Sequence, residues 1–347
     1  LGFGMLGDRL GRIRVMSLTI LTYSAFSALT AFAQTAWQID LTRFMVALGT
    51  GGEWAIAAAL VAETFPIRAR AFASGSFHAS SVLGGALASL TGIWIGEAHW
   101  RWGFLLGLIP ALLVLWVRMS LHEPEGWQET ARRQALTGER LGRLSELLGD
   151  PRWRGRALLG LALAAVGLGT YWGIFAWGPE LVREILANSP PRVRDARASF
   201  VYLLMNMTGG LLGLLCFAPL ADWKGRRCAF AAYHLGALLL VPATYLGAKT
   251  YTQVAWLLPM MAFFVVGMHA GYAIYFPELF PTRLRATGSS FCFNVGRLLG
   301  ACVLLVRGWL GATLGLRQAV VAIAALFFVG LALLAFAPET RGEPLPE

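Results

Sequence analysis

The stretch Leu6–Arg14 reads LGDRLGRIR, and a close copy far downstream, Leu220–Arg227, reads LADWKGRR. Each copy is short and cationic, carries one acid and one glycine, and lies between two long apolar runs. Charged side chains are costly in the hydrocarbon core of a bilayer, so each turn belongs at a membrane surface between two spanning helices. The pair therefore predicts a chain that crosses a membrane several times.

The composition agrees with this prediction. The 347 residues are 57% hydrophobic and 14% charged, with a mean hydropathy of +0.61, which is typical of an integral membrane protein. Apolar runs of about 20 residues, the length of helix that crosses a bilayer, recur along the chain, and no segment shows the alternation of a β-barrel. We expect ten complete spans, at about 15–34, 39–63, 72–96, 102–119, 157–181, 197–219, 228–248, 254–276, 288–310 and 318–337.

The net charge of +10 raises the alternative of a nucleic-acid-binding protein. The distribution of the charge argues against it, because nineteen basic residues fall in one alternating set of turns and the tail, and eight in the opposite set. This asymmetry is the positive-inside pattern of a multi-pass protein. We therefore expect a protein of the plasma membrane, with the more basic turns in the cytoplasm and no nucleic-acid partner.

An internal repeat predicts the architecture. Asp8 and Asp222 are 214 residues apart, and a second turn, Glu63–Ala71 (ETFPIRARA), recurs 215 residues later as Glu278–Ala286 (ELFPTRLRA). Two unrelated turns at nearly the same offset indicate duplication of a multi-helix unit, with both copies facing the same side. If the halves share one layout, the first lacks one whole helix and most of a second, and the complete protein should have twelve spans.

The repeat also predicts the domain boundaries. Residues 1–119 should form an N-terminal transmembrane half, with a stub of helix two followed by helices three to six. Residues 120–156 should form an amphipathic linker on the cytoplasmic face, because helix-forming residues and spaced leucines recur there. Residues 157–337 should form a C-terminal half with helices seven to twelve, and residues 338–347 a cytoplasmic tail.

The two kinds of turn, the run Arg43–Glu53 (RFMVALGTGGE) and Pro338–Gly342 (PETRG) resemble the major facilitator superfamily, over essentially the whole chain. Gly51–Trp54 (GGEW) and Asn294–Arg297 (NVGR) are similar to the metabolite:proton and sialate:proton symporters, whereas PETRG is similar to sugar porters. The resemblance implies an all-α major facilitator fold with two pseudo-symmetric six-helix halves. It also implies transport by alternating access around a site at the membrane midplane.

Glu53 is the first candidate for that site. It lies ten residues before Glu63, which ends its span, and is therefore about 15 Å deep at 1.5 Å per residue. A carboxylate at this depth can exchange a proton as the cavity wets and dries. The alternative is a structural hydrogen bond between helices that the neighbouring glycines allow to pack closely.

Two arginines also lie inside predicted spans. Arg297 is equally deep in helix eleven and can form a bidentate contact with a substrate carboxylate, with Asn294 three residues away on the same face. The alternative for Arg297 is an ion pair with another helix. Arg43, three residues after Asp40, either guards the outer mouth of the cavity or snorkels to the headgroups.

Aromatic residues complete the predicted substrate site. The resemblance places helix ten at the cavity, which selects His269, whereas the other two histidines in spans, His78 and His234, are interpreted as packing residues. Tyr171 and Trp172 of helix seven can stack on a substrate or donate hydrogen bonds to it. Their alternative role is that of interfacial anchors.

A second set of candidates forms a predicted cytoplasmic gate. The resemblance implies that the paired aspartate turns act as a latch that helps hold the outward-facing state, and the alternative is that their arginines only determine topology. The predicted gate residues are Gly7, Asp8, Gly11, Arg12, Glu63, Arg68, Arg70, Asp222, Gly225, Arg226, Glu278, Arg283 and Arg285.

We expect a secondary transporter that moves a small organic anion, a carboxylate or an acidic sugar, by proton symport. The alternatives are a sugar or polyol porter, a drug exporter, and a non-transporting membrane sensor. The chain lacks HExxH, GxSxG and any acid–histidine cluster at ligand spacing, so we expect no enzyme, cofactor or metal. The expected partners are the substrate, protons and the lipid bilayer, and we expect a monomer.

Overall fold

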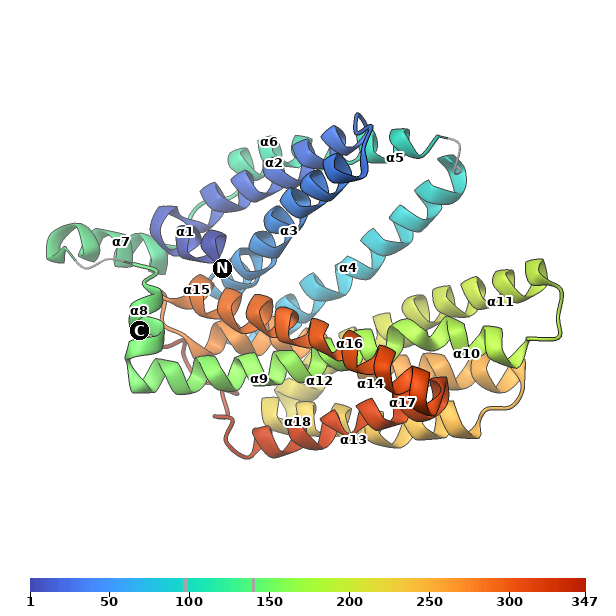
Figure 1. Cartoon of the computed structure of the whole chain (residues 1–347). Coiled ribbons are helices and arrows are strands. Elements are labelled where there is room, and N and C mark those ends of the chain that lie inside the picture. The colour runs from blue at the N-terminus through green and yellow to red at the C-terminus, as the bar shows by residue number, and fades with distance from the viewer. Residues whose placement is uncertain (96–98, 139–140) are drawn as a thin grey trace.

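The computed structural model describes residues 1–95, 99–138 and 141–347 (Figure 1), and within these ranges it contains helices and turns but no strand. A 3-10 turn at Phe175–Trp177 and two π-helical turns at Met205–Gly210 and Phe291–Val295 interrupt the longer helices. The α-helices are α1 (Gly2–Leu10), α2 (Arg12–Thr30), α3 (Ala36–Thr64), α4 (Ile67–Ile95), α5 (Trp100–Leu106), α6 (Ile109–Ser120), α7 (Glu125–Thr137), α8 (Leu144–Gly149), α9 (Pro151–Gly173), α10 (Gly178–Ile185), α11 (Pro191–Leu204), α12 (Leu211–Lys224), α13 (Arg226–Gly247), α14 (Tyr251–Leu279), α15 (Arg285–Ser290), α16 (Gly296–Leu314), α17 (Leu316–Ala324) and α18 (Leu326–Leu334).

Several helical segments are suited to crossing a bilayer. Within the described residues, eight are long and apolar enough, and they coincide with eight of the expected spans: Arg12–Thr30, Ala36–Thr64, Pro151–Ile185, Pro191–Lys224, Arg226–Gly247, Tyr251–Leu279, Arg285–Leu314 and Leu316–Leu334. The other two expected spans fall on α4, except for residue 96, which lies outside the described ranges, and on the pair α5 and α6. The prediction of an all-α integral membrane protein is confirmed.

The duplication is visible in how the helices begin. α3 and α14 both have 29 residues, and each follows a threonine, Thr35 or Thr250, whose side chain accepts a hydrogen bond from the backbone of a glutamine three positions on. Each glutamine bonds back to the backbone of its threonine, which completes a capping box. These threonines are 215 residues apart, so the caps repeat at the offset of the two turns.

Two carboxylates cap the repeated helices α2 and α13. Glu123 accepts hydrogen bonds from the backbone N–H groups of Arg12 (2.7 Å) and of the next residue (3.0 Å) at the start of α2. Glu339 does the same for Arg226 (2.8 Å) and the residue after it (3.1 Å) at the start of α13. Both helices thus have donors at their positive ends satisfied by an acid from a distant segment.

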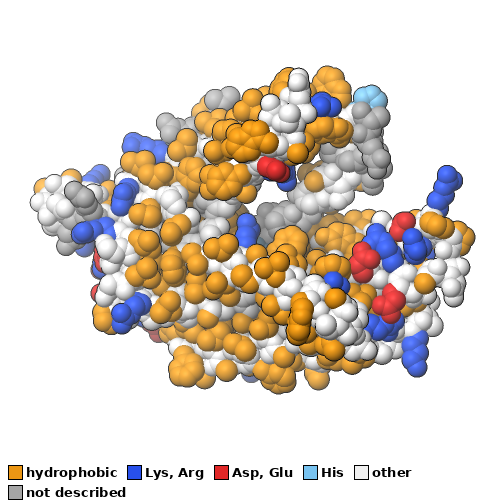
Figure 2. Space-filling model, viewed as in Figure 1, with side chains coloured by type: hydrophobic (Ala, Val, Ile, Leu, Met, Phe, Trp, Pro, Cys, Tyr) orange, Lys and Arg blue, Asp and Glu red, His pale blue; other side chains and the backbone are white. Residues whose placement is uncertain are grey.

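The two halves meet at one end and diverge at the other. In Figure 1 they touch at the end that carries α1, α7, α8 and the C-terminus, here called the linker end. They separate toward the end that carries α5, α10 and α11, here called the open end, where Figure 2 shows a hollow between them. Glycines allow close contact at the linker end, where Gly4 of α1 packs on Ser290 of α15 and Gly75 of α4 on Ala218 of α12.

The lateral surface of both halves is apolar. Figure 2 shows hydrophobic side chains covering the flanks, and large ones such as Trp37, Phe72, Trp309 and Phe336 are exposed. In a bilayer these side chains face lipid rather than water, so their exposure is expected. Inside the second half, α14 is buried without interruption from Val265 to Leu279 and forms the centre of its packing.

The linker packs on the bundle more closely than the sequence suggested. Leu141 and Leu147 are buried, the Trp127 side chain donates a hydrogen bond to the backbone of Asp8 (2.8 Å), and Glu146 forms an ion pair with Arg283 (2.8 Å). Leu147 belongs to the main hydrophobic core cluster and Leu144 packs against it, so apolar side chains of this amphipathic segment contact protein.

Gly11→Ala should destabilise the protein by about 1–2 kcal/mol, because Gly11 has a φ of +108° and an added Cβ would overlap the Glu123 carboxylate. In thermal unfolding of the detergent-solubilised protein, this corresponds to a melting temperature lower by about 2–4 °C per kcal/mol. The matched control is Gly155→Ala on α9, where a Cβ meets no atom within 4 Å. Equal melting temperatures for the two variants would contradict the prediction.

Candidate functional site

A buried network of four charged side chains, Asp8, Arg12, Glu63 and Arg285, lies at the linker end. Arg12 forms two hydrogen bonds with Glu63, from Nε to Oε2 (2.9 Å) and from Nη2 to Oε1 (2.7 Å). Arg285 donates to the same Oε1 (2.7 Å), and the Asp8 carboxylate lies 3.1 Å from Arg12. Two positive and two negative charges balance, which is the condition under which charged groups can be buried.

The network joins the two halves. Asp8, at the end of α1, accepts hydrogen bonds from the backbone N–H groups of Ala286 (3.1 Å) and Thr287 (2.8 Å) and from the Thr287 hydroxyl (2.6 Å), all in α15. Arg12 also donates to the carbonyl of Thr282 (2.8 Å). The linker end is therefore closed by hydrogen bonds as well as by packing.

The second copy of the turn is built differently. Arg226 binds Glu278 through Nε (3.1 Å) and Nη2 (2.8 Å) and contacts Asp222 (2.9 Å). The Asp222 side chain is 39% exposed and, within the described ranges, is paired with Arg226 alone. The hydroxyl of Thr340 in the tail donates to Glu278 (2.6 Å), whereas Arg70, the counterpart of Arg285, interacts with Glu278 only through longer-range electrostatics. Asp8 and Asp222 thus occupy equivalent turns, but only Asp8 bridges the halves.

The other predicted gate residues have varied positions. The backbone of Gly7 accepts a hydrogen bond from Arg12 (2.8 Å), and Gly11 and Gly225 hold the positive φ angles before α2 and α13. Arg283 is paired with the linker, as described above. The structure does not bring Arg68 into the network, since its side chain is exposed and makes no ion pair or hydrogen bond with the described residues.

A cluster of aromatic and histidine rings lies deeper, between the halves. Trp54 of α3 stacks on Phe293, with ring centroids 3.8 Å apart, and its Nε1 donates to Nδ1 of His78 on α4 (3.0 Å). The His78 ring is parallel to that of His269 on α14, 6.5 Å away. Nδ1 of His269 lies 3.0 Å from the Val266 carbonyl and must donate to it, so Nε2 is an acceptor, and this buried atom has no partner.

Arg297 borders this cluster. Its Cζ lies 5.3 Å from the Phe293 ring centroid, four residues earlier, and it is close enough to His269 to affect it electrostatically. Within the described ranges it has neither a carboxylate partner nor a hydrogen bond, so the alternative of an ion pair with another helix is not observed. Asn294 instead donates to the carbonyl of Gly51 (3.0 Å) and contacts the Ser290 hydroxyl (3.1 Å).

Glu53 lies half-buried in the middle of α3. The Tyr23 hydroxyl of α2 donates a hydrogen bond to its carboxylate, and in the described part of the chain Glu53 has no ion pair. Gly49 packs directly on the α2 backbone at Tyr23, as the predicted close helix contact requires. Glu53 is therefore held by a neutral donor.

The remaining predicted site residues are divided between the cluster and the surface. The Tyr171 ring lies 5.4 Å from His269 and belongs to the cluster. Trp172 contacts Tyr171, with ring centroids 5.2 Å apart, but is 44% exposed. Arg43 is exposed, lies 5.8 Å from the Phe104 ring of α5, and is not paired with Asp40.

Trp54, His78 and Phe293 are members of the cluster that sequence reasoning did not select. Trp54 is the last residue of the GGEW motif, so the sequence offered a reason to select it as a site residue. His78 was interpreted as a packing residue, and Phe293 is one of 21 phenylalanines in an apolar chain. Their relation to His269 arises only where α3, α4, α14 and the π-helical turn at Phe291–Val295 meet.

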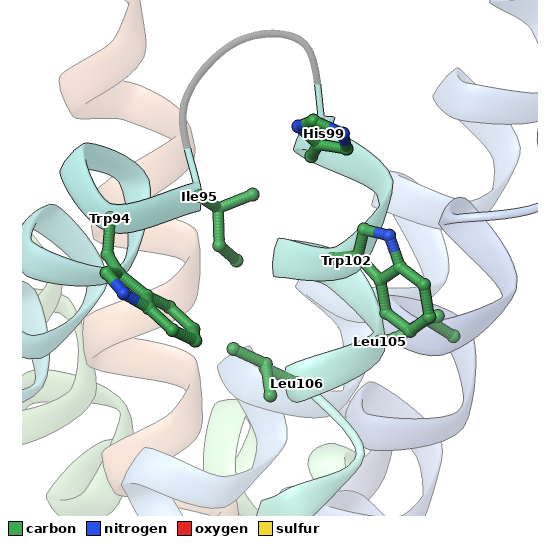
Figure 3. Close-up of a pocket in the computed structure, with 6 residues that line it drawn as sticks. All are labelled: Trp94, Ile95, His99, Trp102, Leu105 and Leu106. Atoms are coloured by element: carbon green, nitrogen blue, oxygen red, sulfur yellow. The ribbon is translucent and has the colours of Figure 1, made fainter.

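An apolar pocket of about 450 Å³ lies at the open end, between α4 and α5 (Figure 3). Trp94 and Ile95 line one side, and Trp102 and Leu106 the other. Trp94 is sixteen residues beyond His78 on α4, about 24 Å along the helix, so this pocket is separate from the cluster. Within the described ranges, no group of three or more histidine, cysteine, aspartate or glutamate side chains is arranged to hold a metal ion.

Comparison with known proteins gives consistent results. A sequence model of the Major Facilitator Superfamily matches residues 1–303. A probable 4-methylmuconolactone transporter of Cupriavidus pinatubonensis is 32% identical over 351 residues, covering 98% of this chain and 78% of that protein. A cis,cis-muconate transport protein of Acinetobacter baylyi is 27% identical (97% and 81% covered), and the sialic acid transporter NanX of Escherichia coli is 24% identical (96% and 79% covered).

The fold is also that of a solved transporter. The structure of the proton:xylose symporter XylE bound to 6-bromo-6-deoxy-D-glucose matches with a TM-score of 0.77, covering 99% of this chain and 84% of that one. At 16% sequence identity, this match shows the fold alone.

Asp8→Asn should open the linker end. The Asp8 carboxylate carries the negative charge that pairs with Arg12 and accepts hydrogen bonds from α15, and the amide lacks this charge. Losing charge-assisted bonds of about 1.5–3 kcal/mol shifts an opening equilibrium by at least about tenfold. Asp222→Asn is the matched control and should shift it far less. The readout is the spin-label distance between positions 68 and 227 in a cysteine-free background, and equal distance distributions in the two variants would contradict the prediction.

Proposed function

The chain belongs to the major facilitator superfamily, and we propose that this membrane transporter carries a small organic carboxylate together with protons. The observation that carries the proposal is the Arg297 guanidinium, which lies inside a spanning segment without a carboxylate partner among the described residues. Its side chain is exposed in this structure, and ionisable residues inside a membrane-spanning segment usually serve a site.

The surroundings of Arg297 suit a flat, unsaturated acid. Phe293 holds one face of the guanidinium, which leaves its edge free for a bidentate contact with a carboxylate. Trp54, Tyr171 and His269 supply rings nearby, and the unpartnered Nε2 of His269 can accept a hydrogen bond from a hydroxyl or a protonated carboxyl group of the substrate. The names of the relatives agree in chemistry, since muconate is an unsaturated dicarboxylate and sialic acid a carboxylated sugar.

Glu53 is the proposed proton-carrying group. Its carboxyl has a tyrosine partner rather than an arginine, so no fixed positive charge holds it in the ionised form. It directly precedes Trp54, a member of the ring cluster, on α3. Protonation there can be coupled to substrate binding through movement of a single helix.

The gate network supplies the conformational part of the proposal. Cross-half hydrogen bonds close the linker end while the open end is hollow, which fits an outward-facing state if the linker end is cytoplasmic. To face inward, the protein has to break the bonds that Asp8 and Arg285 make across the halves. We therefore assign these residues to the cytoplasmic gate.

Arg297→Gln should raise the KM for cis,cis-muconate uptake into proteoliposomes by at least about 30-fold, the loss expected from removing one charged hydrogen-bonding partner worth about 2 kcal/mol. Arg154→Gln, which removes an exposed arginine at the start of α9, should leave the KM unchanged. Competition by neutral sugars but not by carboxylates would reject an anionic substrate.

Glu53→Gln should abolish the stimulation of uptake by an inward proton gradient while leaving substrate exchange across the membrane intact, because the amide cannot carry a proton. Tyr23→Phe is the matched control, since it removes the hydrogen-bond donor and keeps the carboxyl. Unchanged proton coupling in Glu53→Gln would reject this role for Glu53.

A further inference from the structure

A polar pocket of about 530 Å³ lies at the open end of the second half, apart from the ring cluster. Arg307 of α16 and Arg194 of α11 line it together with Trp177 and Leu316. Arg307 follows Arg297 by ten residues on the same helix and is therefore about 15 Å farther toward the open end. Figure 2 shows acidic and basic side chains gathered at this end of the second half.

The acids at this pocket already have partners. Glu180 forms an ion pair with Arg183 (2.6 Å), which also binds Asp195 (3.0 Å). Glu184 is paired with Arg317 (2.7 Å). The three carboxylates are thus satisfied by two arginines, and Arg194 and Arg307 remain.

These two arginines lack comparable partners. Arg307 is only 9% exposed, its Nε is buried without a hydrogen-bond partner, and its Cζ lies 3.1 Å from the centroid of the Trp177 ring. Arg194 forms a long ion pair with Asp195 (3.8 Å from Nε to Oδ1); its side chain is 34% exposed, although its Nε is buried without a hydrogen bond. The buried Arg307 guanidinium, with free donors, is unfavourable unless an anion completes it.

We propose that Arg194 and Arg307 form a second binding site, at the outer mouth of the second half, for a small soluble monocarboxylate. The Arg307 guanidinium lies against the Trp177 ring, and a planar guanidinium can bind a carboxylate through two of its nitrogens at once. The charged residues at and beside the pocket carry a net charge of +1, which matches a single carboxylate. They are four arginines and three acids: Arg183, Arg194, Arg307, Arg317, Glu180, Glu184 and Asp195. This site is distinct from the Arg297 site and does not depend on transport.

The test uses equilibrium binding of radiolabelled benzoate to the full chain in phosphatidylcholine nanodiscs. R297Q should retain an Arg307-dependent benzoate site, and R297Q/R307Q should bind at least about tenfold more weakly. R297Q/R307K should be intermediate, because lysine keeps the charge but loses the bidentate geometry. Neutral benzamide, the matched probe, should not compete.

Equal benzoate binding by R297Q and R297Q/R307Q would overturn the proposal. Loss of all benzoate binding in the R297Q single variant would also overturn it. If R307Q does not fold, R297Q/R194Q serves as the second variant and should also weaken binding. Loss of the benzoate site when phosphatidylglycerol is added would assign the pocket to a lipid headgroup and overturn the soluble ligand. If the Arg297 site binds no benzoate, the wild-type protein should show one benzoate site, and R307Q should remove it. Failure of the proposed function can thus be distinguished from failure of the Arg307 site.

Discussion

The closed end of this protein depends on the buried ion pairs that the Glu63 carboxylate forms with two arginines. This carboxylate binds Arg12 from its own half and Arg285 from the other, and all three side chains are almost completely buried. Removing one partner from a buried ion pair costs about 3–5 kcal/mol, because the remaining charge is left without compensation. Any rearrangement that separates the halves must therefore supply new partners, such as water or other charges, to these groups.

Duplication produced two such networks, but they are not equivalent. In the first, Asp8 reaches across the halves to α15, and Arg285 donates directly to Glu63. In the second, Asp222 remains partly exposed within its own half, and the tail residue Thr340 bonds to Glu278 where Arg285 bonds to Glu63 in the first. The strong bonds between the halves thus belong to the network of Asp8 and Glu63. Opening of the linker end can begin when these bonds break, while the network of Asp222 and Glu278 stays intact.

The ring cluster around His269, with Arg297 at its border, contrasts in charge balance with the buried network of Asp8, Arg12, Glu63 and Arg285. That network is neutral and its groups are satisfied, as a structural element requires. Arg297 and Nε2 of His269 lack partners within the described ranges, which is expected where a ligand completes the site. The two regions are in contact, because Trp54 stacks on Phe293 and Asn294 bonds to Gly51 between the same helices that close below the cluster. A ligand that moves Arg297 therefore acts on a contact that also holds the halves together.

The sequence by itself determined the membrane location, the helical spans and the duplication, because the length of an apolar run and the spacing of repeated turns can be read directly from the order of residues. It also selected Arg12, Glu63 and Glu53 as candidates, since an ionisable residue near or inside a span is recognisable without a structure. Only the tertiary structure decided that Asp8 bridges the halves while Asp222 does not, that Glu123 and Glu339 cap α2 and α13, and that His78 faces His269. These relations join residues on separate helices, so they depend on packing geometry, which no spacing along a single helix encodes.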